Sequence, residues 1–283
     1  MSLKLPKEYN YIGIFLTYAC NLRCSYCLNR QSYLKSLLPM TPSYWIRALN
    51  RIEATEDMPL TLQGGEPTQY PYFYEVINEV DKPMDLLTNG VFDVDRWIKN
   101  VPVKKFYRNA PYASIRISYH PEDTALAVIL KNTLRLQEAG YQVGLYMIEH
   151  PQWKHLIPSI KFQCRQRRID FRTKEFLGVY KGKLYGTYKY PEAVNSLYQR
   201  TKQCRGSELL VAADGKTYKC HSDLYASRNP IGHILNEKGV VEYRFRECKF
   251  YGSCNSCDVK VTTDRRQVFG HTSMEIKGGC YEV

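Results

Sequence analysis

Three cysteines within eight residues constrain this chain more than any other feature of its sequence. They are Cys20, Cys24 and Cys27 in the stretch "YACNLRCSYC". Thiolates bind zinc and iron–sulfur clusters, but a structural zinc site is usually closed by four protein ligands, and this loop supplies three. Three thiolates on a four-iron cluster would leave one iron without a protein ligand. The spacing therefore predicts a metal centre with one position open to a substrate or cofactor.

The other cysteines suggest a second metal site. Cys164 stands alone in an apolar helical pattern and is expected to be a packed core thiol. Six more fall in the last 80 residues: Cys204, Cys220, Cys248, Cys254, Cys257 and Cys280. The sequence has no apolar run of about 18 residues, and its N-terminus lacks the apolar stretch of a secretory signal. We therefore expect a cytoplasmic protein without a membrane partner, whose reduced thiols serve metals rather than disulfides.

The charge of the chain is unevenly distributed. Up to residue 141 it has 16 Lys and Arg against 14 Asp and Glu, whereas from residue 142 onward the counts are 24 and 14. Such an excess suits an anionic substrate, an acidic partner or nucleic acid. No nucleic-acid-binding module accompanies it, so a solvated basic face is favoured over nucleic-acid binding.

Strand and helix patterns alternate through the first two thirds of the chain. Strands are predicted over 11–18, 58–63, 84–90, 113–120, 141–149 and 169–176, and helices over 40–54, 70–80, 91–99, 123–140 and 153–166. This order predicts an α/β fold with a parallel sheet, open or curled into part of a barrel, and an active site at the carboxyl ends of the strands. The alternation of strand and helix patterns stops near residue 177, which predicts two domains, 1–177 and 178–283.

Two of the predicted strands lead directly into motifs. The first runs into the cysteine loop, in which Tyr26 precedes the last cysteine, and the second runs into "GGEP", residues 64–67. This pair resembles the signature of the radical S-adenosylmethionine (radical SAM) superfamily. The resemblance implies a partial (β/α)6 barrel of the TIM type, and a [4Fe-4S] cluster on Cys20, Cys24 and Cys27 whose open iron chelates SAM.

The resemblance also implies where SAM binds. Gly64 and Gly65 would let the backbone approach the methionine amino group, and Glu66, followed by Pro67, suits an ammonium group. Tyr26 would place its backbone near the adenine. Polar residues at strand ends are candidates for the ribose and carboxylate, or are ordinary residues with local hydrogen bonds: Asn89, Ser118, His120 and either Arg172 or Lys174.

The C-terminal cysteines resemble the auxiliary-cluster extension of the same superfamily, known in a longer SPASM form and a shorter twitch form. Cys204 precedes a predicted β-hairpin at Asp214-Gly215, and Cys220 follows Gly215 in the Gly-x4-Cys spacing of that extension. The match is incomplete. Phe245 stands where the long form has a cysteine, and two residues separate Cys254 from Cys257 where the long form has three.

Two ligand assignments follow from these six cysteines. In the favoured one, Cys204, Cys220, Cys254 and Cys257 hold one auxiliary [4Fe-4S] cluster, because four thiolates are the ordinary ligation of a redox-only cluster. In the other, Cys204, Cys220 and Cys257 hold one cluster and a second cluster is held by the remaining three: Cys248, Cys254 and Cys280. A structural zinc is a further alternative.

The implied reaction begins with reductive cleavage of SAM to a 5'-deoxyadenosyl radical, which abstracts hydrogen from a substrate. An auxiliary cluster would accept an electron, and flavodoxin or ferredoxin would supply the reducing electron. The SAM loop begins at residue 20, which leaves no room before it for a peptide-binding domain, and the second half is basic. These features favour a small or anionic substrate such as a sugar, nucleotide or cyclitol derivative.

Alternatives remain open at the level of sequence. The first is maturation of a peptide with a separate recognition protein. The second is a non-catalytic iron–sulfur electron carrier or regulator, against which Gly64 to Glu66 argue. The catalytic residues are unknown, because too many Tyr, His, Asp and Lys side chains could serve as the general base.

Overall fold

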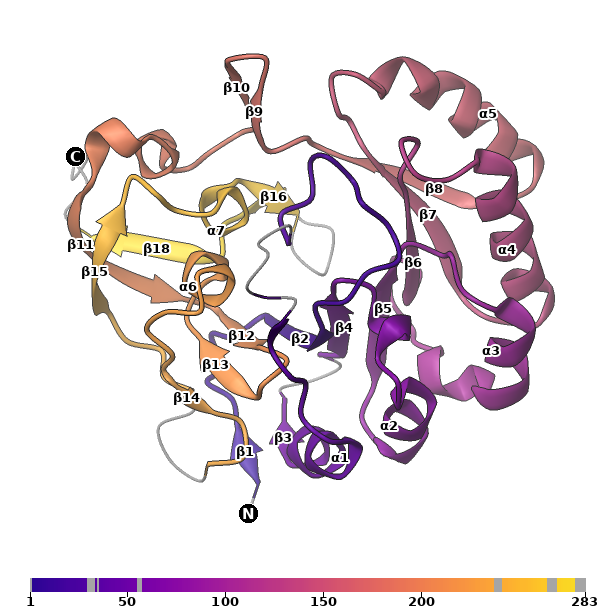
Figure 1. Cartoon of the computed structure of the whole chain (residues 1–283), viewed down its shortest axis with the longest axis horizontal. Coiled ribbons are helices and arrows are strands. Elements are labelled where there is room, and N and C mark those ends of the chain that lie inside the picture. Colours follow the sequence, from indigo (N-terminus) through magenta and orange to yellow (C-terminus); the bar gives the residue numbers. More distant parts are fainter. Residues whose placement is uncertain are drawn as a thin grey trace.

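A nine-stranded sheet with the order β14-β13-β12-β2-β4-β5-β6-β7-β8 organises the protein (Figure 1). The computed structural model describes residues 2–29, 34, 36–54, 58–236, 241–263 and 269–277. Neighbouring strands from β12 through β2 to β8 are parallel, whereas β13 pairs antiparallel with β12 and with β14. The parallel strands curve around an interior, and α1 to α5 cover their outer side (Figure 1). The predicted α/β partial barrel is confirmed.

The six predicted strands and five predicted helices are all present. The strands of this part of the chain are β1 (Leu3–Lys4), β2 (Tyr11–Thr17), β3 (Ile52–Glu53), β4 (Leu60–Gly64), β5 (Met84–Thr88), β6 (Ile115–Tyr119), β7 (Val143–Ile148) and β8 (Asp170–Lys174). The helices are α1 (Pro42–Asn50), α2 (Phe73–Glu79), α3 (Val94–Asn100), α4 (Leu126–Glu138) and α5 (Ile157–Gln166).

The remaining residues form smaller elements beside the barrel. These are β9 (Gly178–Tyr180), β10 (Lys183–Tyr185), β11 (Arg200–Gly206), β12 (Glu208–Val211), β13 (Lys216–Tyr218), α6 (His221–Tyr225), β14 (Gly232–His233), β15 (Arg246–Tyr251), α7 (Ser256–Val259), β16 (Thr262–Thr263), β17 (Phe269–His271) and β18 (Met274–Lys277). β15, β11 and β18 form a separate three-stranded antiparallel sheet. β12 lies beside β2, so residues from the predicted second domain extend the sheet of the first.

Local sequence signals explain where these elements begin and end. Pro158 lies in the first turn of α5, where its missing N–H would have no helical partner in any case. α4 ends at Gly140, which has a φ of 93°. Gly140 N donates to Gln137 O at 2.9 Å and Tyr141 N donates to Leu136 O at 3.0 Å, the two bonds of a Schellman cap. The predicted hairpin at Asp214-Gly215 joins β12 to β13.

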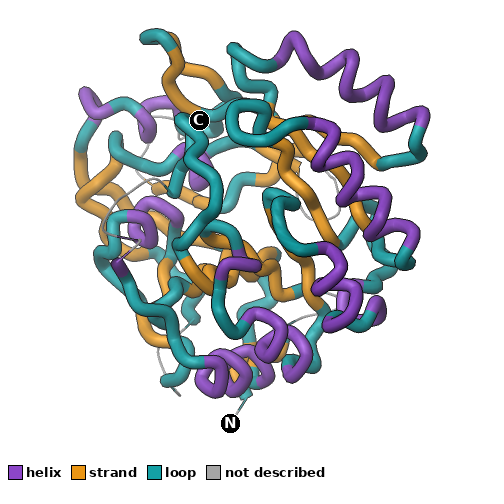
Figure 2. Tube along the Cα trace, turned by 45° about the vertical axis from the view of Figure 1, so that its right-hand side comes forward, coloured by secondary structure: helices purple, strands orange, loops and turns teal. Residues whose placement is uncertain are grey.

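Alternation along the strands separates an apolar outer face from a more polar inner face. Ile12, Ile14 and Leu16 of β2 are completely buried in the main core, together with Trp45 and Trp97 from the surrounding helices. Figure 2 shows the helices gathered along one side of the strands. The residues between these outward positions therefore face the interior of the partial barrel. Within the described residues, no helix is long and apolar enough to span a membrane.

A buried ion-pair triad lies near the amino ends of the central strands. Asp85 of β5 contacts Arg108 Nε at 3.3 Å and Arg116 Nη2 of β6 at 3.1 Å. The Asp85 side chain is 1% exposed. Because each charge in this group is withdrawn from water, removing the single carboxylate leaves two guanidinium groups uncompensated.

We predict that Asp85→Asn lowers the free energy of unfolding by about 3 kcal/mol, the range for breaking a buried ion pair. The matched control is Asp81→Asn, because Asp81 pairs with Lys82 at 3.8 Å and its side chain is 73% exposed. The control is expected to change stability by less than about 0.5 kcal/mol. Urea unfolding followed by circular dichroism measures both variants, and equal stabilities would refute the structural role of the triad.

Candidate cofactor and auxiliary-cluster sites

The two predicted motifs meet at the carboxyl ends of neighbouring strands. The cysteine loop follows β2, and residues 64–67 follow β4, which pairs in parallel with β2. Gly65 N donates to Thr17 O at 2.9 Å, and Glu66 N donates to Ala19 O at 2.8 Å. These two backbone bonds continue the pairing beyond the strands and fix the chain immediately before Cys20.

Glycine is required where these segments touch. A Cβ atom on Gly65 would collide with the carbonyl oxygens of Tyr18 and Ala19, and one on Gly64 would collide with that of Thr17. Gly64 also has a φ of 135°, which a residue with a side chain rarely adopts. The pair of glycines therefore allows the approach of one backbone to another, in addition to any approach to a ligand.

Glu66 is a buried carboxylate with several protein donors. Its Oε1 accepts from Thr68 N at 3.2 Å, Thr68 Oγ1 at 2.8 Å and Thr88 Oγ1 at 2.8 Å, and its Oε2 accepts from Asn89 N at 2.7 Å. Burial raises the pKa of Glu66, and these hydrogen bonds act in the opposite direction. Glu66 thus connects the end of β4 to the end of β5. Pro67 is buried and begins the short 3-10 helix η2 (Pro67–Gln69) that follows it.

Asn89 joins the end of β5 to the first cysteine of the loop. Its Nδ2 lies 3.9 Å from Cys20 Sγ and donates to Asn21 Oδ1 at 2.7 Å. Leu22 N also donates to Cys20 Sγ, at 3.4 Å. Such N–H donors around a sulfur suit a thiolate ligand, because they stabilise its negative charge. The structure therefore places the sequence-predicted residue Asn89 beside the loop.

Tyr26 and His120 are in direct contact, although 94 positions separate them. Tyr26 OH lies 3.0 Å from His120 Nδ1, and the Tyr26 ring stacks on His150 with centroids 4.9 Å apart. Burial lowers the pKa of both histidines, which favours neutral imidazoles. Phe176 packs edge-on against His150 at 4.5 Å. This aromatic group ties the cysteine loop to the ends of β6 and β7.

Sequence reasoning missed two residues that hold the loop. Glu122 Oε2 accepts from Ser25 N at 3.0 Å and from Ser25 Oγ at 2.9 Å, which fastens the loop between Cys24 and Cys27. His150 supports Tyr26 as described above. Neither lies in a motif, and only their positions just after predicted strands could have indicated them. Ser118, which was predicted, is half-buried on the inward face of β6.

Lys174 lies at the carboxyl end of β8 and faces the barrel interior. Its Nζ lies 5.4 Å from the ring centroid of Tyr146, an inward residue of β7. The side chain has solvent access, yet the surrounding protein and the cations Arg116 and Lys260 lower its pKa to about 7, while the Cys257 thiol acts in the opposite direction. A Lys174 amine is therefore partly neutral near pH 7. By contrast, Arg172 is bound to Asp170 Oδ2 at 2.9 Å.

Four of the C-terminal cysteines surround one cavity. Its sulfur-bearing walls come from Cys204 on β11, Cys220 before α6, Cys248 on β15 and Cys254 before α7. The rest of its lining combines apolar and charged side chains: Phe250, Val259, Met274, Ile276, Ser222, Lys219, Arg228, Asp223 and Asp258. Within the described part of the chain, no three His, Cys, Asp or Glu side chains converge closely enough to bind a single metal ion.

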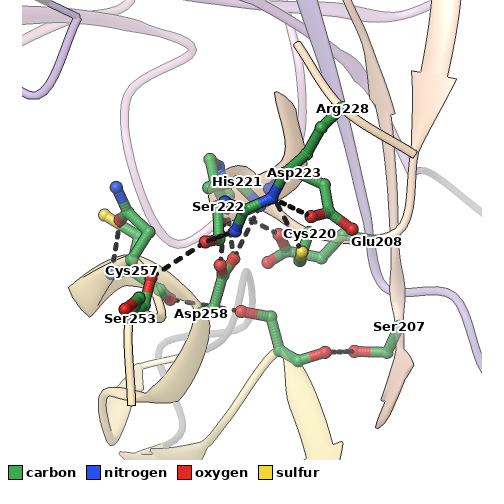
Figure 3. A network of polar contacts seen from close by, with 12 residues as sticks. Ser207, Glu208, Cys220, His221, Ser222, Asp223, Arg228, Ser253, Cys257 and Asp258 are labelled. Carbon is green, nitrogen blue, oxygen red and sulfur yellow. Dashed lines mark hydrogen bonds and ion pairs between the residues drawn. The ribbon is translucent and has the colours of Figure 1, made fainter. Parts of the chain in front are cut away.

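Charged residues beside this cavity form a connected network (Figure 3). Asp223 is bound by the Lys219 ammonium and by Arg228 Nε, the latter at 2.8 Å from Oδ1. Asp258 accepts from His221 N at 2.8 Å and from Ser222 N at 2.9 Å. The cavity thus has four thiols, N–H donors and two cations on its walls. The four thiols and the N–H donors fit an iron–sulfur cluster, while the two cations balance the Asp223 and Asp258 carboxylates on the same walls.

Cys257 and Cys164 lie outside this cavity. Cys257 is on α7 but does not line the cavity. Burial raises the pKa of its thiol, and Lys260 and Lys174 act in the opposite direction. Cys164 is completely buried in the main core, as predicted. Cys280 lies outside the described residues, so any assignment that includes it stays a prediction.

Sequence comparison finds relatives that are named GTP 3',8-cyclase. The chain is 22% identical over 232 residues to a GTP 3',8-cyclase of Clostridium perfringens (strain 13 / Type A), across 77% of this chain and 69% of that protein. It is 25% identical over 228 residues to the GTP 3',8-cyclase of Clostridium perfringens (strain SM101 / Type A), across 77% of this chain and 61% of that protein. No protein-family model matches the chain.

Structure comparison identifies proteins of the same fold. Native anSMEcpe with bound AdoMet and Kp18Cys peptide superposes with a TM-score of 0.56 and 14% identity, over 81% of this chain and 78% of that one. SuiB of Streptococcus suis, bound to the precursor peptide SuiA, gives a TM-score of 0.56 and 14% identity, over 82% and 63%. Together, these comparisons agree with the predicted resemblance: the sequence relatives are named as enzymes, and the structural neighbours share the fold of this chain, one of them with AdoMet bound.

We predict that Gly65→Ala weakens SAM binding to the anaerobically reconstituted protein by at least about tenfold. A Cβ atom there collides with the backbone just before Cys20, and overpacking of this kind costs about 1–3 kcal/mol. Equilibrium dialysis with labelled SAM measures the effect.

The matched control for this substitution is Gly182→Ala, in the turn between β9 and β10. Gly182 also has a positive φ, of 75°, but a Cβ there meets no atom within 4 Å. It is expected to lower stability by about 1 kcal/mol and to leave SAM binding unchanged. Equal SAM affinities of the two variants would contradict the role given to the contact.

We predict that acetylation of Lys174, followed by mass spectrometry across pH, shows a midpoint near pH 7, because only the neutral amine reacts. The internal control is the same lysine in urea, where loss of the surrounding protein and cations returns the midpoint toward about 10.4. A midpoint near 10 in the folded protein would rule out the proposed environment.

Proposed function

We propose that this chain is a radical SAM enzyme, which uses the open iron of its cluster to cleave SAM and thereby abstracts hydrogen from a substrate at the barrel opening. One observation carries the proposal: two backbone hydrogen bonds join the cysteine loop to the glycine pair, Gly65 N to Thr17 O and Glu66 N to Ala19 O. A cluster bound to SAM supplies a 5'-deoxyadenosyl radical. The other steps depend on how this chain's side chains hold and shield the reacting groups.

Cys20, Cys24 and Cys27 would hold the cluster, and the backbone at Gly64 and Gly65 would lie against the amino-acid end of SAM. Glu66 acts chiefly as a positioning residue in this proposal. Its Oε1 accepts hydrogen bonds from Thr68 and Thr88, and its Oε2 accepts one from Asn89 N. Its Oε2 retains acceptor capacity toward an ammonium group.

The aromatic group at the loop would hold the nucleoside end of SAM. Tyr26 is fixed by its contacts with His120 and His150, so its backbone has a defined position when SAM arrives. A pre-organised loop loses less conformational freedom on binding, which favours affinity. Ser118, on the inward face of β6, remains a proposed polar contact to SAM.

For the substrate, we favour a small anionic molecule. Lys174 faces the barrel interior, and Arg116 and Lys260 are close enough to lower its pKa. A bound anion would relieve the repulsion among these cations. The sequence relatives carry the name GTP 3',8-cyclase, which agrees with a phosphorylated substrate. Lys174 is also our candidate for the proton acceptor that oxidation of a substrate requires, since its pKa is about 7.

A peptide substrate is the second candidate. Two structural neighbours of the same fold were solved with peptides bound, the Kp18Cys peptide on anSMEcpe and SuiA on SuiB. A flavodoxin or ferredoxin as the electron donor also belongs to the proposal. A protein that carries electrons without consuming SAM would also need the cysteines, but it would not need the close contact of Gly64 and Gly65 with the backbone before Cys20.

The proposal predicts that reconstituted, dithionite-reduced protein forms 5'-deoxyadenosine from SAM. Cys24→Ala is expected to abolish this formation, because it removes one of three ligands. The matched control is Cys164→Ala, since Cys164 is buried in the main core away from the loop. Chromatography of the quenched reaction measures the product. Formation by the Cys24 variant at the wild-type rate, or none by the wild type, would reject the proposal.

A further inference from the structure

The side chains that bound the C-terminal cavity differ from both ligand sets expected from the spacing of the cysteines. The cavity is lined by Cys204, Cys220, Cys248 and Cys254, whereas the favoured set had Cys257 in place of Cys248. We infer that Cys248 completes the auxiliary-cluster site and that Cys257 remains a free thiol on the barrel side of α7. This inference rests on the proposal that the chain holds an auxiliary cluster.

Strand register places Cys248 next to Cys204. β11 and β15 are antiparallel, and Cys248 lies opposite Lys202, two residues from Cys204 on the same strand. Residues two apart on a strand point to the same face, so both thiols face the cavity. Their exposed fractions are 9% and 3%, while Glu247 and Lys249, the neighbours of Cys248, are exposed. The Cys204 and Cys248 thiols are close enough to share a hydrogen bond.

Cys220 and Cys254 approach the cavity from the other side. Cys220 is the residue before α6, and its sulfur accepts from Asp223 N at 3.4 Å. Cys254 N donates to Ala193 O at 2.8 Å, which fixes the turn between β15 and α7. The four ligands thus come from four separately anchored segments. A site of this kind exists only in the folded chain, so its ligands cannot be recognised from local spacing.

α7 directs Cys257 away from this site. Successive helical residues point about 100° apart, and the next residue, Asp258, is the one that faces the cavity. Asp258 is held there by its bonds to His221 N and Ser222 N, which fix the rotation of the helix. Figure 3 shows the Cys257 sulfur and the Cys220 sulfur on opposite sides of the Asp258 contact. Cys257 instead interacts electrostatically with Lys174 of β8.

Charge at the cavity supports the same set of ligands. Lys219 and Arg228 line it beside Cys248, and Arg228 Cζ lies 3.7 Å from the ring centroid of Phe250, which is two residues from Cys248 on β15. These cations balance the Asp223 and Asp258 carboxylates that also line the cavity, so the side chains of its wall add no net negative charge to that of four thiolates and a cluster. Both cations are held in place by Asp223, which is 1% exposed. The cations therefore belong to the same site as Cys248.

The test measures iron in a background that lacks the SAM loop ligands. In the triple variant Cys20→Ala, Cys24→Ala, Cys27→Ala, the remaining iron reports the auxiliary site alone, and about four irons per chain are expected for one cubane. Adding Cys248→Ala should remove most of that iron and the absorbance of the cluster. Adding Cys257→Ala, the matched control, should leave about four. The inference is wrong if Cys257→Ala removes the iron and Cys248→Ala leaves it, or if neither substitution removes it.

A second measurement does not depend on how well a variant folds. Native, reconstituted wild-type protein is treated anaerobically with iodoacetamide and then digested for mass spectrometry. Because burial raises the pKa of Cys257, the alkylation is carried out at about pH 9; Cys257 should then be alkylated several-fold faster than Cys248, since a cluster ligand is protected and a free thiol can ionise and react. Protection of Cys257 with alkylation of Cys248 would overturn the inference. Formation of 5'-deoxyadenosine by the wild type is scored separately, so a failed ligand assignment is distinguishable from a failed reaction.

Discussion

The contact of two backbones at the ends of β2 and β4 is the constraint on which the site depends. Two N–H groups of the 64–67 segment donate to carbonyl oxygens just before Cys20, and the approach is possible only because Gly64 and Gly65 have no side chains. The contact converts two motifs separated by some forty positions into a single surface. Parallel pairing of the strands supplies the geometry, since it brings their carboxyl ends to one edge.

The rest of the barrel supports this surface from several strands. Asn89 at the end of β5 reaches Cys20, and His120 at the end of β6 reaches Tyr26. Glu66, which follows β4, connects to the end of β5 through its buried carboxylate. At the opposite ends of the strands, Asp85 forms ion pairs with two arginines. The barrel interior thus has an Asp85–arginine ion-pair triad at the amino ends of the strands and Lys174, which Lys260 repels, at the carboxyl end.

Much of the fold could be predicted from the sequence, because strand and helix periodicity is local. The strand that leads into the cysteine loop and the turn at Gly215 were found this way. The residues that hold the cysteine loop in place could not be predicted in this way. Glu122 and His150 lie far along the chain from the residues that they contact, and no motif contains them. They meet Ser25 and Tyr26 only through the tertiary fold.

The auxiliary cysteines illustrate the same limit more sharply. A spacing of two residues between Cys254 and Cys257 suggests a shared site, yet α7 begins between them and rotates the second sulfur away. Cys248 joins Cys204 through strand register, which spacing along the chain does not reveal. β12, in turn, extends the barrel sheet from the C-terminal region: its consecutive buried residues Leu209, Leu210 and Val211 pair in parallel with β2. A domain boundary predicted from the sequence pattern does not show that a strand from one region pairs with the sheet of the other.

The central claim is that the three-cysteine loop leaves one iron for SAM. Pulsed electron–nuclear double resonance of the reduced protein, with SAM labelled by 15N in its amino group, tests this claim most directly. The account predicts a hyperfine coupling between the label and the cluster that is absent without SAM. A cluster spectrum that shows no coupling to bound SAM would contradict it.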